Sequence, residues 1–317
     1  MKVIEHLERA TKTLFSFEIL PPLKGKNIKE IFEGIDPLME FNPPFINVTY
    51  HREEYVYKER EKGLLEKVSV RKRPGTVGIC AAIINKYNVD AVPHLICGGF
   101  SKEETENALI DLSFLGIDNV LALRGDPIKS ENTFKPDPTG HAYAVDLVGQ
   151  IRGMNNGEFL DDELTGVTAT DFCIGAACYP EKHFEALSLK TDMAYLKQKV
   201  DAGAEYLVTQ MFFDNQKYFD FVSLCRENEI HIPIIPGLKP ITSLKHISFI
   251  PKTFHIDLPD PFADELLKCK TTLQVKQVGV EWMTEQAKEL IDFGAPCLHF
   301  YTMGRSDSVR QIAAAVF

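Results

Sequence analysis

Two carboxylates in this chain stand where the sequence changes abruptly from apolar to polar. Glu18 lies between two apolar residues just before a pair of prolines, and Asp126 closes the turn Arg124-Gly125-Asp126. A carboxylate that is buried among apolar groups is costly, and its pKa rises toward neutrality. Such a group can give a proton to a substrate, so Glu18 is a candidate general acid. An Arg-Gly-Asp turn taken alone is most often only a turn.

Other polar side chains stand at the ends of short apolar runs, and each has a structural explanation when taken alone. A histidine within a strand, for example, is more often a hydrogen-bonded core residue than a ligand. The spacing of His51, His94 and Cys97 matches no recognised metal site, and no serine or cysteine nucleophile lies beside a histidine in a known motif. Together the polar groups predict a cradle for a large polar cofactor with one proton donor and no metal.

Predicted strands and helices alternate along the whole chain, and their packing could bring these residues together. Runs rich in Val, Ile and Phe alternate with longer segments of helical period, which is typical of a parallel α/β protein. Eight strands are expected at residues 14–20, 45–50, 91–97, 119–123, 172–179, 206–211, 232–237 and 297–302. Helices are expected at residues 26–41, 74–86, 102–115, 192–202, 215–228, 275–293 and 306–316.

Eight strand–helix units favour a closed (β/α)8 TIM barrel, with its active site at the carboxyl ends of the strands. Residues 1–317 are predicted to form one domain. A long insert is expected at residues 128–171, between the fourth and fifth strands; it contains a helix near residues 144–152 and is a candidate lid. Neither glycine fingerprint for a bound phosphate, G-x-G-x-x-G or G-x-x-x-x-G-K-[ST], is present.

Composition narrows the class of protein. The formal net charge is −10, which argues against a general nucleic-acid binder. Seven scattered cysteines without a C-x-x-C pair favour reduced thiols in a cytoplasmic protein. The amino terminus has no secretory signal pattern, and the apolar stretch 77–100 is interrupted by charged residues and proline, so no membrane association is expected.

The motifs at the strand ends, taken as an ordered set, resemble the methylenetetrahydrofolate reductase family over nearly the whole chain. They are Ser16-Phe17-Glu18 followed by Pro21-Pro22, Val48-Thr49-Tyr50, Pro93-His94-Leu95, Leu123-Arg124-Gly125-Asp126, Tyr179-Pro180-Glu181, Asp201-Ala202-Gly203-Ala204, Thr209-Gln210, Ile235-Pro236-Gly237 and His299-Phe300-Tyr301-Thr302.

The resemblance implies an FAD-containing barrel that reduces 5,10-methylenetetrahydrofolate to 5-methyltetrahydrofolate with NADH or NADPH. It implies that Glu18 is the general acid and that Asp126 faces flavin and folate and stabilises a cationic iminium. The positions that it assigns to the cofactor are Thr49, His94, Arg124, Gly125, Asp126, Tyr143, Ala144, Tyr179, His183, Ala186, Asp192 and Lys199. Those that it assigns to the substrate are Gln210, His246, Tyr301 and Arg305, with His246 standing where the family has a glutamine.

The resemblance also implies a homo-oligomer and a role in supplying methyl groups for methionine synthesis. The carboxyl-terminal regulatory domain of the animal and yeast enzymes is expected to be absent, and inhibition by S-adenosylmethionine with it. Two other functions stay open: a pterin-binding barrel methyltransferase without flavin, and a non-catalytic folate-binding protein.

Overall fold

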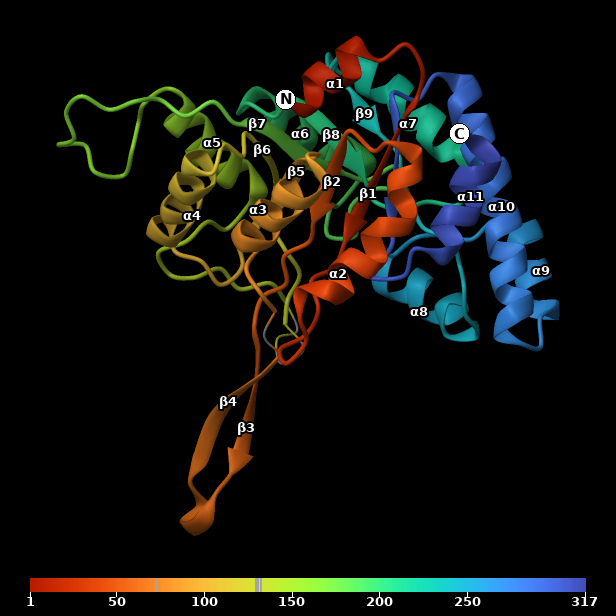
Figure 1. Ribbon diagram of the computed structural model, residues 1–317, viewed down its shortest axis with the longest axis horizontal. Coiled ribbons are helices and arrows are strands. Elements are labelled where there is room, and N and C mark those ends of the chain that lie inside the picture. The colour runs from red at the N-terminus through yellow and green to blue at the C-terminus, as the bar shows by residue number, and fades with distance from the viewer. Residues whose placement is uncertain (72, 129–130, 132) are drawn as a thin grey trace.

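A ring of parallel strands forms the centre of the computed structural model, which describes residues 1–71, 73–128, 131 and 133–317 (Figure 1). The strands follow the order β10-β11-β1-β2-β5-β6-β7-β8-β9, so the two ends of the sheet are neighbours in the chain. This confirms the predicted parallel barrel. Its strands are β1 Leu14–Ile19, β2 Phe45–Val48, β5 Asp90–Ile96, β6 Asn119–Leu123, β7 Cys173–Cys178, β8 Tyr206–Thr209, β9 Ile234–Ile235, β10 Gly237–Leu238 and β11 Cys297–Tyr301.

The strand expected at residues 232–237 is divided in two by Pro236. Proline has no N–H to give to a ladder, so continuous pairing is interrupted there. β9 pairs with β8, and β10 pairs with β11, so the ring closes through the peptide between them. Gly237 sits so close to the Thr209 carbonyl and the Tyr301 hydroxyl that a Cβ would collide with both.

Helices surround the ring and bury their apolar faces against it (Figure 1). The predicted helices are present within a few residues of their expected limits. Ser101 begins α4 with the expected capping box, because its hydroxyl accepts from the Glu104 N–H at 3.1 Å. The helices are α1 Val3–Arg9, α2 Ile28–Ile35, α3 Thr76–Tyr87, α4 Lys102–Phe114, α5 Ala144–Asn155, α6 Leu189–Asp201, α7 Asn215–Glu227, α8 Leu244–Phe254, α9 Asp260–Lys268, α10 Thr272–Phe293 and α11 Asp307–Val316, with the 3₁₀ turn η1 Asp36–Phe41 after α2.

α1 was not expected, and it closes the amino end of the barrel. Val3 is fully buried in a cluster with inward-facing side chains such as Phe45 and Leu121. The side chain of Asn119 accepts from the Val3 N–H at 2.7 Å and donates to the Met1 carbonyl at 2.9 Å. The amino end of the ring is therefore packed, and the polar side chains collect at the carboxyl end.

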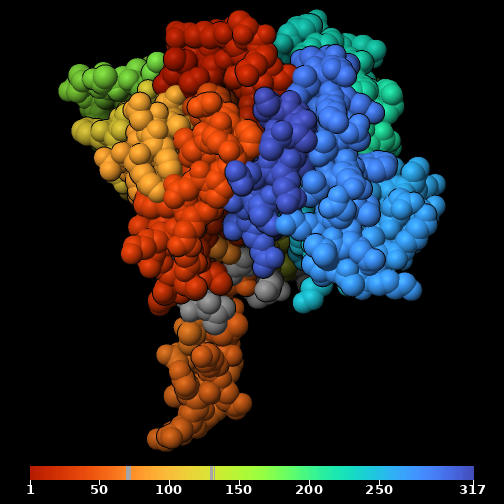
Figure 2. Space-filling view, turned by 45° about the vertical axis from the view of Figure 1, so that its right-hand side comes forward, coloured from red at the N-terminus to blue at the C-terminus, as the bar shows by residue number. Residues whose placement is uncertain are grey.

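A β-hairpin at the carboxyl end was also not expected. β3 Glu54–Glu59 and β4 Leu65–Arg71 pair antiparallel around the 3₁₀ turn η2 Glu61–Gly63. The hairpin stands clear of the body of the molecule, on the end opposite α1 (Figures 1 and 2). Leu64 and Leu65, near its turn, are 66% and 67% exposed.

The predicted insert contains a helix of the outer ring. α5 buries Leu147, Val148, Ile151 and Met154 in the main core, between β6 and β7 in sequence. The connection from β6 to α5 begins at the carboxyl end of β6, and residues 156–172 lead from α5 back to the amino end of β7. Residues 129, 130 and 132 lie outside the described part. No described helix is both long and apolar enough to span a membrane.

Candidate active site

Glu18 lies near the carboxyl end of β1 and points into the barrel. The alternation of β1 sends Phe15 and Phe17 outward into the helical layer, so Ser16 and Glu18 face inward. The side chain of Glu18 is only 13% exposed. Burial raises the pKa of its carboxyl group to about 7, while the Thr49 hydroxyl and the Lys239 ammonium act in the opposite direction.

His94 on β5 is the nearest ring to this carboxyl group, with Nε2 3.6 Å from the Glu18 Oε2. Burial lowers the pKa of His94 to about 3, with a further contribution from His299 and His51. The imidazole is therefore neutral at physiological pH, and the contact is not an ion pair. The side-chain amide of Asn47 lies 3.3 Å from the same Nε2 and fixes the ring.

Tyr301 closes the opposite side of Glu18. The two residues are register partners on β11 and β1, and the Tyr301 hydroxyl donates to the Thr209 carbonyl at 2.6 Å. Burial and the Glu18 carboxylate raise the pKa of this phenol well above its usual value, so it keeps its proton. Glu18, Thr49, His94 and Tyr301 are thus brought together around one arc of the ring.

The Arg124-Gly125-Asp126 turn follows β6 directly. Gly125 has φ +83°, a conformation that favours glycine. The Arg124 guanidinium pairs with Glu185 and lies over the Phe134 ring, 5.0 Å from its centre. Asp126, the last residue of this turn, is exposed, and no hydrogen bond joins the two described carboxylates Asp126 and Glu18.

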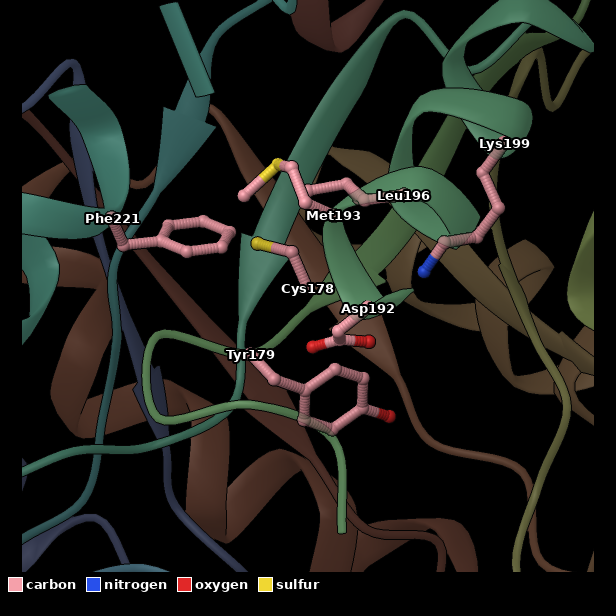
Figure 3. Close-up of a pocket in the computed structure, with 7 residues that line it drawn as sticks. All are labelled: Cys178, Tyr179, Asp192, Met193, Leu196, Lys199 and Phe221. Atoms are coloured by element: carbon pink, nitrogen blue, oxygen red, sulfur yellow. The ribbon is translucent and has the colours of Figure 1, made fainter. Parts of the chain in front are cut away.

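A second group of predicted cofactor residues gathers at the end of β7 and the start of α6. Figure 3 shows Asp192 and Lys199 extending from α6 beside Tyr179, around a small cavity that these three residues help to line. The Tyr179 ring meets His183 edge to face at 4.6 Å, and the His183 N–H donates to Asp192 at 2.8 Å.

Electrostatic interactions tie this group to the Arg124 turn. Burial lowers the pKa of Lys199, whose ammonium donates to the Ala177 carbonyl at 2.5 Å. Burial and then Arg124 lower the pKa of His183, and burial and Asp126 raise that of Tyr179 above its usual range. The buried Ala186 lies on the same loop as His183.

Tyr143 and Ala144 occupy the first turn of α5, where the Tyr143 N–H is capped by Asp146 at 3.1 Å. The Tyr143 side chain is 61% exposed, unlike the buried polar group around Glu18. The structure therefore places this pair at the carboxyl end of the ring without packing it into either group.

The predicted substrate residues come from three different connections. Gln210 follows β8, and its side-chain oxygen accepts from the Met211 N–H at 2.9 Å. His246 lies in α8, and Arg305 lies exposed after β11. Burial lowers the pKa of His246, with a further contribution from Lys239 and then Arg305. His246 and Arg305 thus lie close enough to interact, together with a residue that the sequence reading missed.

That residue is Lys239, which directly follows β10 and is 5% exposed. A lysine after a strand is ordinarily a solvated residue, so its residue type alone does not predict a place in the site. Its position after Pro236-Gly237, at the same kind of strand end as the other site residues, is the signal that could have revealed it.

Comparison with known proteins identifies the family of the chain. The family model described as methylenetetrahydrofolate reductase matches residues 2–316. Methylenetetrahydrofolate reductase (NADH) 1 of Arabidopsis thaliana is 31% identical and aligns with 96% of this chain and 48% of its own length. A probable NADPH form from Caenorhabditis elegans is 32% identical over 98% of this chain and 43% of its own length. The chain spans about half the length of these two relatives.

A bacterial relative is matched over most of its length. The 5,10-methylenetetrahydrofolate reductase of Pectobacterium carotovorum is 30% identical over 92% of this chain and 86% of its own length. Among solved structures, an uncharacterized Clostridium thermocellum protein, described as binding two copies of 5-methyl-5,6,7,8-tetrahydrofolic acid, superposes with a TM-score of 0.59. It is 16% identical and covers 99% of this chain and 98% of its own, so it supports the fold. The match over residues 2–316 and the bacterial relative together establish that the chain belongs to the methylenetetrahydrofolate reductase family.

Proposed function

We propose that this protein is an FAD-dependent reductase that converts 5,10-methylenetetrahydrofolate to 5-methyltetrahydrofolate, with NADH or NADPH as the electron donor. The observation that carries the proposal is Glu18, a carboxyl group held inside the barrel mouth with a pKa of about 7. Membership of the family supports the substrate class, and relatives named for both NADH and NADPH leave either nucleotide open.

The residues at the carboxyl end fit a flavin dinucleotide. Arg124 and Lys199 supply positive charge for a pyrophosphate, although Arg124 must then share its guanidinium with Glu185. Gly125 lets the backbone approach a ligand closely because it carries no side chain. The side-chain oxygen of Asn47 is buried and has no partner among the described residues, so it can accept a hydrogen bond from a ring N–H. When bound, the flavin would relay a hydride from the nicotinamide to the folate.

Glu18 would supply the proton that opens the folate's five-membered ring. Its O–H bond breaks as a bond forms from the proton to N10, and cleavage of the bond between N10 and the bridging carbon leaves an iminium at N5. The neutral His94 and the protonated Tyr301 lie beside the carboxyl group and carry no charge, and burial favours its protonated form until the proton is transferred. The Asp126 carboxylate, exposed at the mouth, would stabilise the cationic iminium.

The remaining expectations belong to the same proposal. They are a cytoplasmic location, a homo-oligomeric state and a place as supplier of methyl groups for methionine synthesis. None of the groups of His, Cys, Asp and Glu in the described part of the chain is arranged to hold a metal ion.

Two half-reactions test the function with one preparation. After supply of FAD the protein should be yellow, bleach anaerobically with NADH or NADPH, and regain its colour with 5,10-methylenetetrahydrofolate. Glu18→Gln should keep bleaching but slow colour recovery by roughly 10²–10⁴-fold, since that is the usual contribution of a general acid. Protein that takes up no flavin would overturn the reductase assignment and favour a flavin-free methyltransferase or a folate carrier. Normal colour recovery in Glu18→Gln would remove only Glu18 from the acid role.

A further inference from the structure

Lys239 carries a buried positive charge that has few hydrogen-bond acceptors and no directly paired carboxylate in the described structure. Its side chain is 5% exposed, and its ammonium makes one long hydrogen bond, to the Tyr301 carbonyl at 3.5 Å. It makes no direct ion pair with any carboxylate in the described part of the chain. A buried ammonium is costly unless a charge or several strong acceptors stabilise it. This position therefore needs an explanation other than stability.

The register of the barrel places Lys239 near Glu18. Leu238 pairs with Phe300, so the next residue, Lys239, is level with Tyr301, and Tyr301 is in turn the partner of Glu18. Side chains at one level of neighbouring strands project to the same face of a sheet. Lys239 and Glu18 thus flank Tyr301 from the two sides and share the interior of the barrel mouth.

The two groups interact electrostatically. Burial lowers the pKa of Lys239 to about 8, and the Glu18 charge opposes this shift. Burial raises the pKa of Glu18 to about 7, and the Lys239 charge opposes that shift after the Thr49 hydroxyl. The ammonium therefore makes the carboxylate form of Glu18 less unfavourable than burial alone would.

No other charged group in the described structure serves this purpose. His94 faces Glu18 from β5 but is neutral, because its pKa is lowered to about 3. Tyr301 faces it from β11 and keeps its proton, and Thr49 beyond β2 carries no charge. His246 approaches Lys239 from α8, and its pKa is also lowered, so it too is neutral near pH 7.

We infer that Lys239 is a positioning residue for proton transfer, whose buried ammonium stabilises the carboxylate that Glu18 becomes when it protonates the substrate. This rests on the proposed function, in which the Glu18 O–H bond breaks and the proton goes to N10 of the folate. The step leaves an anion on a side chain that is only 13% exposed, which is unfavourable without a nearby cation. The same ammonium keeps Glu18 from becoming too weak an acid to transfer its proton.

Lys239→Met tests the inference because methionine keeps much of the side-chain volume and removes the charge. The pH above which the folate half-reaction slows should move upward by about one unit, as expected for loss of a partly buried charge several ångströms away. Below that limit the half-reaction should be several-fold slower, because the acid is weaker. The nicotinamide half-reaction and FAD content should stay unchanged. Lys239→Arg should behave like the unmodified protein.

A second measurement needs no turnover. Infrared spectroscopy of the purified protein across pH detects the C=O stretch of a protonated carboxyl group, and its absence in Glu18→Gln identifies the Glu18 band. In Lys239→Met this band should persist to higher pH than in the unmodified protein. Lys268→Met is a matched control, since it removes an exposed lysine on α9 that pairs with Glu265, and it should leave the band in place.

The outcomes separate the inference from the function on which it rests. An infrared band and an alkaline limit that both stay fixed in Lys239→Met, while Glu18→Gln loses folate reduction, would overturn the role of Lys239 alone. Equal slowing of both half-reactions in Lys239→Met would assign Lys239 to structure instead. Normal folate reduction in Glu18→Gln would overturn the acid assignment itself, whatever Lys239→Met does.

Discussion

At the scale of single residues, the proposed chemistry depends on a carboxyl group that keeps its proton at neutral pH. Glu18 meets this requirement through burial, and its neighbours are neutral or cationic, not anionic. The sequence predicted this residue because a glutamate between two apolar side chains is difficult to explain as surface. It did not predict Lys239, because a lysine is ordinarily solvated, and its position after Pro236-Gly237 at a strand end is the one local sign that it belongs to the site.

The pH dependence of the folate half-reaction follows from this burial. The pKa of Glu18 is raised to about 7, so the proton-donating form is complete below that value and is lost as the pH rises through it. The rate of flavin reoxidation by 5,10-methylenetetrahydrofolate should therefore be nearly constant well below pH 7, fall to about half near it, and fall about tenfold per pH unit well above it. Stopped-flow absorbance at each pH measures this rate. A rate that rises with pH through this range would contradict proton donation by Glu18.

At the scale of elements, the interruption of the seventh strand brings the Gly237 backbone close to the Thr209 carbonyl and the Tyr301 side chain. β9 and β10 meet at Pro236, and Gly237 leaves the space through which the Tyr301 hydroxyl reaches the Thr209 carbonyl. The Gly237 N–H also donates to the Thr209 hydroxyl at 2.9 Å. Glycine is needed here for space and not for an unusual backbone angle.

Gly237→Ala should destabilise the protein, because its Cβ would collide with the Thr209 carbonyl and the Tyr301 hydroxyl. Overfilling a packed site costs about 1–3 kcal/mol, and thermal denaturation of the variant should show a lower melting temperature. Adding Tyr301→Phe removes the hydroxyl oxygen and should recover part of the loss. An unchanged melting temperature would contradict this and show that both the Thr209 backbone and the Tyr301 side chain can move aside without cost.

Most elements could be predicted from hydrophobic periodicity, and the exceptions have identifiable physical reasons. Residues 54–71 form a hairpin in which the side chains of residues 54–68 are largely solvated, so this segment lacks the apolar alternation of a half-buried strand. α8 contains Pro251 within the helix, which the sequence rules treat as an end. The predicted cofactor residues, such as Thr49 and Lys199, could be assigned only through the family resemblance. A single hydrogen-bonding group at the end of a strand does not by itself indicate a binding site.

At the scale of the whole molecule, the residues that close and stabilise the barrel and the residues proposed for the chemistry lie at opposite ends of it. α1 and Asn119 close the amino end, whereas Glu18, His94 and Lys239 lie toward the carboxyl end. Changes at the closed end should therefore affect unfolding without altering the chemistry. The hairpin of β3 and β4 extends from the carboxyl end of the barrel, where the proposed site lies. The exposed side chains of Leu64 and Leu65 do not contribute to the core.

Asn119→Ala should lower the free energy of unfolding by about 1–3 kcal/mol, because it leaves the buried Val3 N–H and the Met1 carbonyl without their partner. Urea denaturation measures this loss, and both half-reactions should keep their rates in the folded protein. Asn228→Ala is the control, because the hydrogen bond that the Asn228 side chain donates to the Leu224 carbonyl is exposed. Loss of this hydrogen bond should lower the free energy of unfolding only slightly. A selective loss of folate reduction in Asn119→Ala would show that the two ends are coupled.

The pairing of β1 with β11 also determines at which stage of folding the proposed active site forms. Leu14 is aligned with Cys297, so the ring closes only when segments from the two ends of the chain have met. Contacts between such distant segments form late, since a long loop must close before they are made. Glu18 becomes buried, and Lys239 comes near it, only when β1 pairs with β11. A partly folded chain that has most of its helices but lacks this pairing would therefore contain an exposed, ionised Glu18. During refolding, the proton donor should therefore appear only with completion of the ring.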